Sequence, residues 1–175
     1  MSVTIQAVCF SAESEDQEAL LDSVLTEQVF LSQANRKMLA WAAALACRDQ
    51  SVIALVKNCL GALAENEKRE LLFAVNRMSV TNPYFVSRGV IDLAAGGTLD
   101  ALSLRSFEDI KVTNEIAYHY ACVGVSMVNG GYNCFRSHSS SLRQLGETDQ
   151  AIDQALRITA ALMAARQISF NQTVL

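Results

Sequence analysis

Residues 116–138, IAYHYACVGVSMVNGGYNCFRSH, decide how the rest of this chain is interpreted. A long uncharged segment reaches a break at Asn129-Gly130-Gly131, and two adjacent glycines inside an apolar pattern end one helix and let the next begin. Cys134 then falls in the first turn of the new helix, where the positive end of the helix dipole is expected to lower a cysteine pKa. His138 follows four residues later on the same face, about 5–6 Å away at Cβ. A thiol, a dipole and a base are therefore expected to meet here.

The same Cys/His spacing has a purely structural interpretation. Cysteine is among the most buried residue types, and a packed thiol beside a hydrogen-bonded histidine produces the same pattern. Both interpretations stay open on the spacing alone.

Composition indicates a single all-α domain. The chain has 175 residues, of which 51% are hydrophobic and 18% charged, and this balance suits a globular core and is poor for disorder. Abundant alanine and a single proline favour helix. We expect residues 1–13 to form a flexible N-terminal arm and residues 14–175 to form one all-α domain.

Charge and hydropathy exclude two classes of partner. A net charge of −4 without a cluster of Lys and Arg argues against nucleic-acid binding. Residues 116–135 are long enough to span a bilayer, but their asparagines, His119 and glycines would be costly in lipid, so we expect no membrane span.

The five cysteines are an odd number with irregular spacing, so no disulfide framework or zinc finger is expected. The N-terminus lacks the basic and apolar regions of a signal peptide, and we expect a cytoplasmic protein whose cysteines stay reduced.

Apolar periodicity and capping residues predict seven or eight helices. The first helix is expected at about residues 15–31, the second begins at a cap at Asn35, and the third runs from a cap at Asp49 to Gly61. The fourth is expected from Asn66 to a stop at Asn82-Pro83, and a short helix follows at 84–88. The last three are expected from Thr113 or Asn114 to the glycine break, from the break to Leu145, and from Thr148 to about Phe170.

Residues 129–156 resemble the alkyl hydroperoxidase D (AhpD) branch of the carboxymuconolactone decarboxylase superfamily. The matching pieces are Asn129-Gly130, Cys134, Ser137-His138, Leu142-Arg143, Gly146, Ala151-Ile152 and Ala155-Leu156, with weaker likeness at 78–89 and 41–50. The resemblance implies an AhpD-like helical domain. It also implies an antioxidant peroxidase, an oxidoreductase that reduces hydroperoxides through thiols.

Two positions depart from the family's pattern, which is a Glu twelve residues before a Cys-x-x-Cys and a His four residues after it. The first cysteine is replaced by Gly131, and His119 stands at the position of the glutamate. Cys134 and His138 match. In the family the two thiols cycle between dithiol and disulfide while Glu and His relay protons, and a lone thiol cannot close that disulfide.

Three chemical readings follow for His119, Cys134 and His138. In the first, Cys134 alone is oxidised by peroxide to a sulfenic acid and is resolved by an outside thiol, with His138 as the base and His119, at the glutamate position, as a further catalytic residue. In the second, the three side chains hold a metal such as Zn²⁺. In the third, the chain is a degenerate paralogue that keeps the pocket for binding or assembly without redox turnover. Cys122 is a weaker candidate for a substitute resolving thiol, because a cysteine in such an apolar helix is usually only packed in the core.

The resemblance also implies the partners. Relatives form homo-oligomers, commonly homotrimers, and are reduced by a thiol reductant or work with a peroxiredoxin. We expect no bound cofactor.

Overall fold

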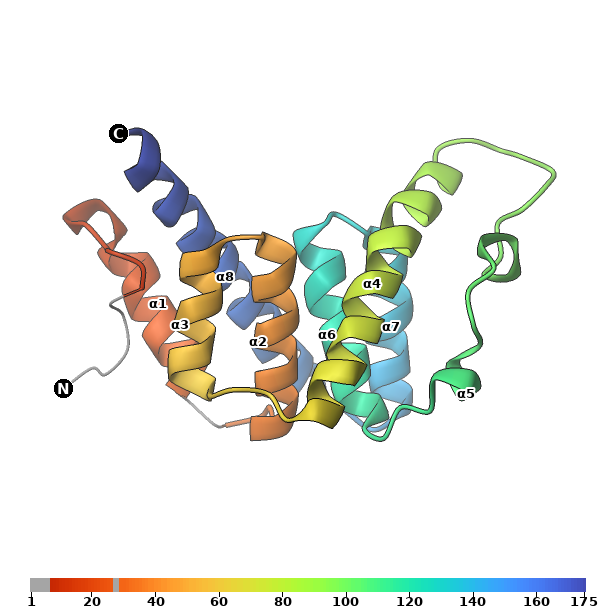
Figure 1. Cartoon of the computed structure of the whole chain (residues 1–175), viewed down its shortest axis with the longest axis horizontal. Coiled ribbons are helices and arrows are strands. Elements are labelled where there is room, and N and C mark those ends of the chain that lie inside the picture. Colours follow the sequence, from red (N-terminus) through yellow and green to blue (C-terminus); the bar gives the residue numbers. More distant parts are fainter. Residues whose placement is uncertain (1–6, 27–28) are drawn as a thin grey trace.

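The computed structural model describes residues 7–26 and 29–175, and all regular structure in these ranges is helical, as predicted. Within these ranges, eight α-helices and two short 3-10 helices follow one another (Figure 1). The α-helices are α1 (Glu15–Thr26), α2 (Gln33–Cys47), α3 (Gln50–Leu60), α4 (Glu65–Arg88), α5 (Phe107–Ile110), α6 (Glu115–Val128), α7 (Tyr132–Gln144) and α8 (Asp149–Val174), and the 3-10 helices are Ala12–Ser14 and Asp100–Leu102.

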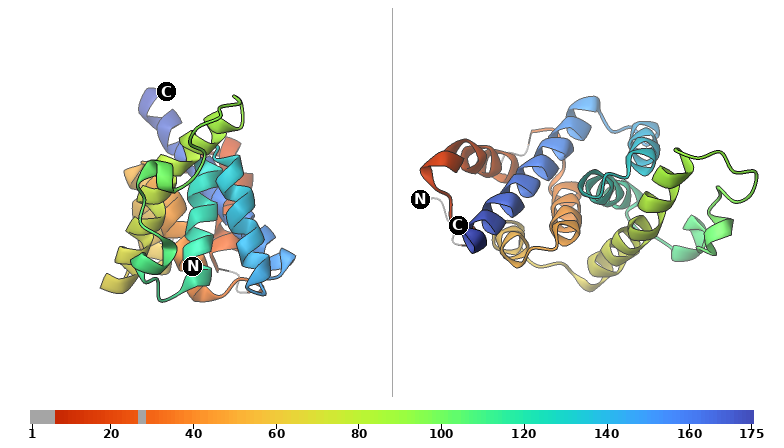
Figure 2. Two further views of the ribbon diagram at one scale, coloured as in Figure 1. Left: turned by 90° about the vertical axis from the view of Figure 1, so that its right-hand side faces the viewer. Right: turned by 90° about the horizontal axis from the view of Figure 1, so that it is seen from above.

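Helix α6 lies at the centre, where it packs against α2, α4, α7 and α8 (Figure 2). All but four of its fourteen residues are buried, which explains why the segment carries so little charge. Gly124 lets α2 approach closely, because a Cβ there would lie 3.0 Å from a methyl group of Leu39. One apolar cluster joins α2 and α6 to α1, α3 and α8, and a second joins them to α4. A cavity lies on the side of the second cluster, whose Met78, Tyr118 and Cys134 line it.

Polar caps fix where several helices begin. The side chains of Asp49, Asn114 and Thr148 each accept a hydrogen bond from a backbone N–H in the first turn, as predicted. The predicted cap at Asn35 was wrong, because Ser32 caps α2 and accepts from the N–H of Asn35. Helix α4 begins at Glu65, one residue before the predicted Asn66.

The predicted stop at Asn82-Pro83 was also wrong, because α4 runs through Pro83 to Arg88. Proline removes one backbone hydrogen bond and disfavours a helix interior. Contacts on both sides of Pro83 oppose this cost. Asn82 accepts a 3.0 Å hydrogen bond from the hydroxyl of Ser126, and the backbone carbonyl of Phe85 accepts one of 2.6 Å from the Asn133 side chain. Tertiary packing against α6 and α7 therefore keeps the helix continuous.

Both ends of the chain differ in detail from the expected pattern. Helix α1 ends at Thr26, ahead of the predicted residue 31, and residues 27–28 lie outside the described residues. Residues 1–6 of the expected arm also lie outside them, whereas Val8 is buried in the core. Helix α8 continues past Phe170 to Val174. No helix in the described part of the chain is long and apolar enough to cross a membrane.

Candidate active site

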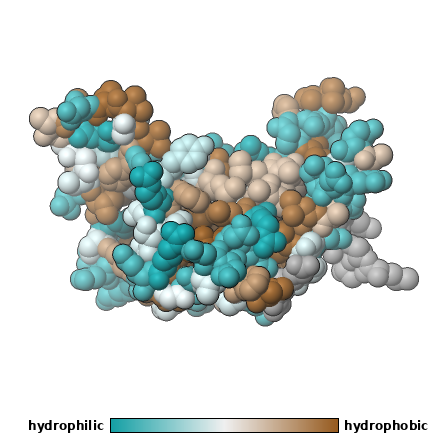
Figure 3. Space-filling view, turned by 180° about the vertical axis from the view of Figure 1, so that it is seen from behind, coloured by the Kyte–Doolittle hydropathy of each residue, from teal (hydrophilic) through white to brown (hydrophobic). Residues whose placement is uncertain are grey.

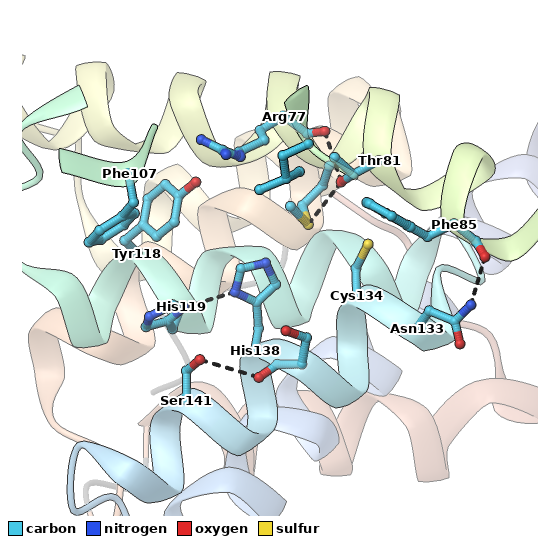
Figure 4. Close-up of a pocket in the computed structure, with 13 residues that line it drawn as sticks. Arg77, Thr81, Phe85, Phe107, Tyr118, His119, Asn133, Cys134, His138 and Ser141 are labelled. Atoms are coloured by element: carbon cyan, nitrogen blue, oxygen red, sulfur yellow. Dashed lines mark hydrogen bonds between the residues drawn. The ribbon is translucent and has the colours of Figure 1, made fainter. Parts of the chain in front are cut away.

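A cavity of about 460 Å³ opens between α4, α6 and α7, with the segment that holds Leu99 and Phe107 along one side. His119, Cys134 and His138 all line it, so the structure brings together the three residues singled out from the sequence (Figure 4). The remaining lining residues are Arg77, Met78, Thr81, Phe85, Leu99, Phe107, Tyr118, Asn133, Ser137 and Ser141. The walls are mostly apolar, as in pockets that take small organic molecules.

The glycine break places Cys134 as predicted. Gly130 has a φ of +69°, a conformation that side chains other than glycine rarely adopt. Gly131 then caps α7, its N–H donating to the backbone carbonyl of Ser126 at 2.8 Å. Cys134 is the third residue of α7, in its first turn.

The expected lowering of the Cys134 pKa was wrong. The side chain is buried, with 7% of the residue exposed, and burial raises the pKa of the thiol. The Thr81 side chain and a backbone hydrogen bond oppose this rise without cancelling it. Desolvation disfavours the thiolate more than the start of α7 favours it. The thiol of Cys134 is therefore mainly protonated at neutral pH.

The two histidines bind each other. Nδ1 of His119 lies 2.8 Å from Nδ1 of His138, so one ring must donate its proton and the other must accept it. Figure 4 shows the His138 ring turned toward His119, while the sulfur of Cys134 points toward α4. His138 therefore shares one face of α7 with Cys134, as the spacing predicted, but its Nδ1 is hydrogen-bonded to His119.

Glu115 completes a row of three polar groups. Its Oε1 lies 3.6 Å from Nε2 of His119, a position that orients the ring and favours a proton on that nitrogen. Burial lowers the pKa of His119, opposed by Glu115. Burial also lowers the pKa of His138 to about 3, with His119 and Arg77 adding to the effect. Both imidazoles are therefore neutral near pH 7.

Asn82 fills the place of the missing cysteine. A Cβ at Gly131 would lie 2.7 Å from the Cβ of Asn82 and closer still to its Cγ and Oδ1. Atoms cannot approach so closely, so the glycine is required by its neighbour in α4. This contact could not be predicted from the sequence, because the two residues belong to different helices.

Neither a second thiol nor a third metal ligand completes the site among the described residues. Cys122 is 0% exposed and does not line the cavity, and burial raises the pKa of its thiol. Both Cys122 and Cys134 are free thiols. The predicted alternative of a metal held by His119, Cys134 and His138 is not supported, because no group of three His, Cys, Asp or Glu side chains with suitable geometry occurs in the described ranges.

Arg77, Thr81 and Tyr118 were missed by sequence reasoning. Arg77, Thr81 and Phe85 follow one another at intervals of four residues on α4, so they share one face of that helix. This spacing was the only available signal, and it did not reveal which helix that face would meet.

No profile of a known protein family matches the chain. The alkyl hydroperoxide reductase AhpD of Anaeromyxobacter sp. strain K is 30% identical over 139 residues, which are 77% of this chain and 73% of that protein. AhpD of Mycobacteroides abscessus is 27% identical over 127 residues, 72% of each protein. AhpD of Caulobacter vibrioides is 33% identical over 94 residues, 52% of this chain and 50% of that protein. On the strength of this similarity and of the all-helical fold, the chain belongs to the AhpD family.

Proposed function

We propose that this protein reduces organic hydroperoxides through the single thiol of Cys134. The observation that carries the proposal is the position of this sulfur, in the wall of an apolar cavity that two neutral imidazoles also line. The name of the relatives, alkyl hydroperoxide reductase, supports the same substrate class.

The proposed first step is attack of the Cys134 sulfur on the outer oxygen of the hydroperoxide. An S–O bond forms, the O–O bond breaks, and the alcohol leaves as an alkoxide, so that the cysteine is oxidised to a sulfenic acid. The proton lost by the thiol is passed to the departing alkoxide. His138 lies one helical turn from Cys134, about 5–6 Å at Cβ, and a bound hydroperoxide can bridge that gap. Each neutral imidazole has one N–H and one acceptor nitrogen, so the hydrogen-bonded pair can accept a proton at one nitrogen while it donates one from another.

The proposed second step requires a thiol from outside the chain. Position 131 carries no cysteine and Cys122 is sealed in the core, so no disulfide with either can form at the cavity. An external thiol attacks the sulfenic acid, releasing water and leaving a mixed disulfide. A second external thiol then reduces this disulfide and regenerates Cys134. A small thiol or a protein partner in a reducing compartment such as the cytoplasm meets this need.

The test is to trap the intermediate. Stoichiometric cumene hydroperoxide is added with dimedone, and each cysteine is analysed by mass spectrometry. We expect one adduct on Cys134, lost in Cys134→Ser and retained in Cys122→Ser, together with consumption of hydroperoxide in the presence of dithiothreitol. Equal labelling of all five cysteines, or none, rejects the proposal.

A binding module without redox turnover is the second candidate, favoured by the burial that raises the pKa of Cys134. In that case the cavity still holds an organic ligand, but hydroperoxide produces no adduct and no turnover. The trapping experiment separates the two functions directly.

We also propose a homotrimer, in line with the resemblance to AhpD. Supporting it, apolar side chains project from the segment after α4, where Val90 is 80% exposed and Ile91 and Leu93 about half exposed. Figure 3 shows apolar surface on this projection, at the upper left. Light scattering coupled to size-exclusion chromatography should give three times the 19.0 kDa chain mass, and a monomer would reject the proposal.

A further inference from the structure

One end of the cavity carries a positive charge without a carboxylate to balance it. Arg77 is the sole permanent cation among the described lining residues, and none of these residues is acidic. Its Nη1 donates to the backbone carbonyl of Arg105 at 3.1 Å, which leaves other guanidinium N–H groups to bind a ligand. None of the ion pairs among the described residues involves Arg77.

A buried hydroxyl lies at the same end. Tyr118 is 1% exposed and lines the cavity. Its hydroxyl lies beside the thiol of Cys122 and the guanidinium of Arg77, but it makes no hydrogen bond of normal geometry to either. Figure 4 shows this hydroxyl pointing toward α4 on the side of Arg77. Burial raises the pKa of Tyr118, with Arg77 close enough to oppose the rise. The phenol therefore keeps its proton and offers it as a donor. Buried polar groups normally have a partner, so a missing one here indicates a ligand.

The rest of the cavity is suited to a hydrocarbon chain. Met78, Phe85, Leu99 and Phe107 supply apolar wall. A volume of about 460 Å³ lies within the range of small-molecule pockets, roughly 300–1,000 Å³.

We propose that Arg77 and Tyr118 bind the carboxylate of a medium-chain monocarboxylic acid whose hydrocarbon chain lies along the apolar wall. A carboxylate accepts from a guanidinium and a phenol at once, and its charge offsets that of Arg77. As a statement about substrates, which would then be carboxylated organic hydroperoxides, the inference rests on the proposed function. As a statement about binding, it is independent of Cys134 chemistry.

The test compares octanoate with 1-octanol, which has the same chain length and no charge, by isothermal titration calorimetry at pH 7.5. We expect octanoate to bind at least about tenfold more tightly, since a hydrogen bond to a charged group has about this effect or more. Arg77→Gln should weaken octanoate binding at least about tenfold and leave octanol within about twofold, and Tyr118→Phe should weaken octanoate by a smaller factor. Arg105→Gln is the matched control. Its guanidinium stacks on Phe73 outside the cavity, so neither affinity should change.

A second measurement places the ligand and does not depend on the folding of any Arg77 variant. Saturating octanoate should slow alkylation of Cys134 by iodoacetamide in the wild-type protein at least about threefold, read by mass spectrometry. Equal affinity for octanoate and octanol, octanoate affinity retained in a folded Arg77→Gln protein, or the absence of protection would each overturn the inference. Titration of Cys134→Ser keeps the two proposals apart, because octanoate binds this variant whether or not Cys134 reacts with peroxide.

Discussion

Gly131→Ala should destabilise this protein, although the backbone at that position suits alanine. Gly131 has φ −81° and ψ 58°, outside the left-handed region. At a backbone that alanine tolerates, replacing glycine usually stabilises a protein by about 0.4–1 kcal/mol, because the unfolded chain loses freedom. The added methyl group, however, would lie 2.7 Å from the Cβ of Asn82 and closer still to its amide group.

The magnitude follows from these opposing effects. Overpacking a buried site costs about 1–3 kcal/mol. Subtracting a stabilisation of about 0.7 kcal/mol from a cost of about 2 kcal/mol, the middle of each range, leaves a net loss of about 1.3 kcal/mol. For a chain of this size each kcal/mol lowers Tm by about 2–4 °C, so the variant should melt about 3–5 °C below wild type.

The assay is a double-mutant cycle of Gly131→Ala and Asn82→Ala, in which urea unfolding measures the free energy of unfolding of each variant. Asn82→Ala alone removes the hydrogen bond from Ser126 and should cost about 1 kcal/mol. The double variant should be at least about 0.5 kcal/mol more stable than the sum of the two single losses predicts, because Asn82→Ala removes the two closest contacts, with Cγ and Oδ1, and leaves only the 2.7 Å contact with Cβ. Additive losses, or a Gly131→Ala protein as stable as wild type, would refute the contact between α4 and the start of α7.

Three further predictions concern titration and helix strain. Burial raises the pKa of Cys134. In a variant whose sole cysteine is Cys134, the rate of alkylation by iodoacetamide should therefore rise about tenfold between pH 7 and pH 8, because only the thiolate reacts. A rate that reaches a plateau below pH 8 would contradict this. The pKa of His138 is lowered to about 3 from an unfolded value of about 6.5, so the unfolded chain binds the extra proton and stability falls as pH drops below 6.5. Urea unfolding should show that wild type loses about 2 kcal/mol more than His138→Asn between pH 7.5 and 5, and equal losses would exclude a buried neutral imidazole. Pro83→Ala should raise Tm by about 4–8 °C in a thermal melt, since it restores a backbone donor within α4, and an unchanged Tm would show that the proline causes no strain.

Much of the fold could be predicted because its signals are local. Asp49, Asn114 and Thr148 each stand immediately before an apolar periodic run, and a cap depends only on the following turn. The break at Gly130 likewise requires nothing beyond its own backbone conformation. The continuous α4 could not be predicted in this way, because the contacts that hold Pro83 in a helix come from α6 and α7.

The candidate site shows the same division between local and distant information. Periodicity and resemblance were enough to place His119, Cys134 and His138 at one cavity. They could not give the bond between the imidazoles, which depends on how α6 and α7 cross, or the raised pKa of Cys134, which depends on burial. The roles proposed for Arg77 and Tyr118 rest on the absence of an ion pair and of a well-formed hydrogen bond, and neither absence can be detected in the local sequence.

The two departures from the AhpD pattern change the charge and the number of thiols of the same cavity. Where the resemblance places a glutamate, His119 is neutral at pH 7, so a negative charge is absent from the wall and the charge of Arg77 is left unbalanced. Where it places the first cysteine, Gly131 lets Asn82 pack against the start of α7, so the site keeps one thiol. A dithiol site with an acidic relay would repel a carboxylate and reduce itself internally. The proposed function and ligand together assign to this site, with one thiol, a neutral imidazole pair and an unbalanced arginine, an anionic organic ligand and an external reductant, and both assignments trace to changes at two positions.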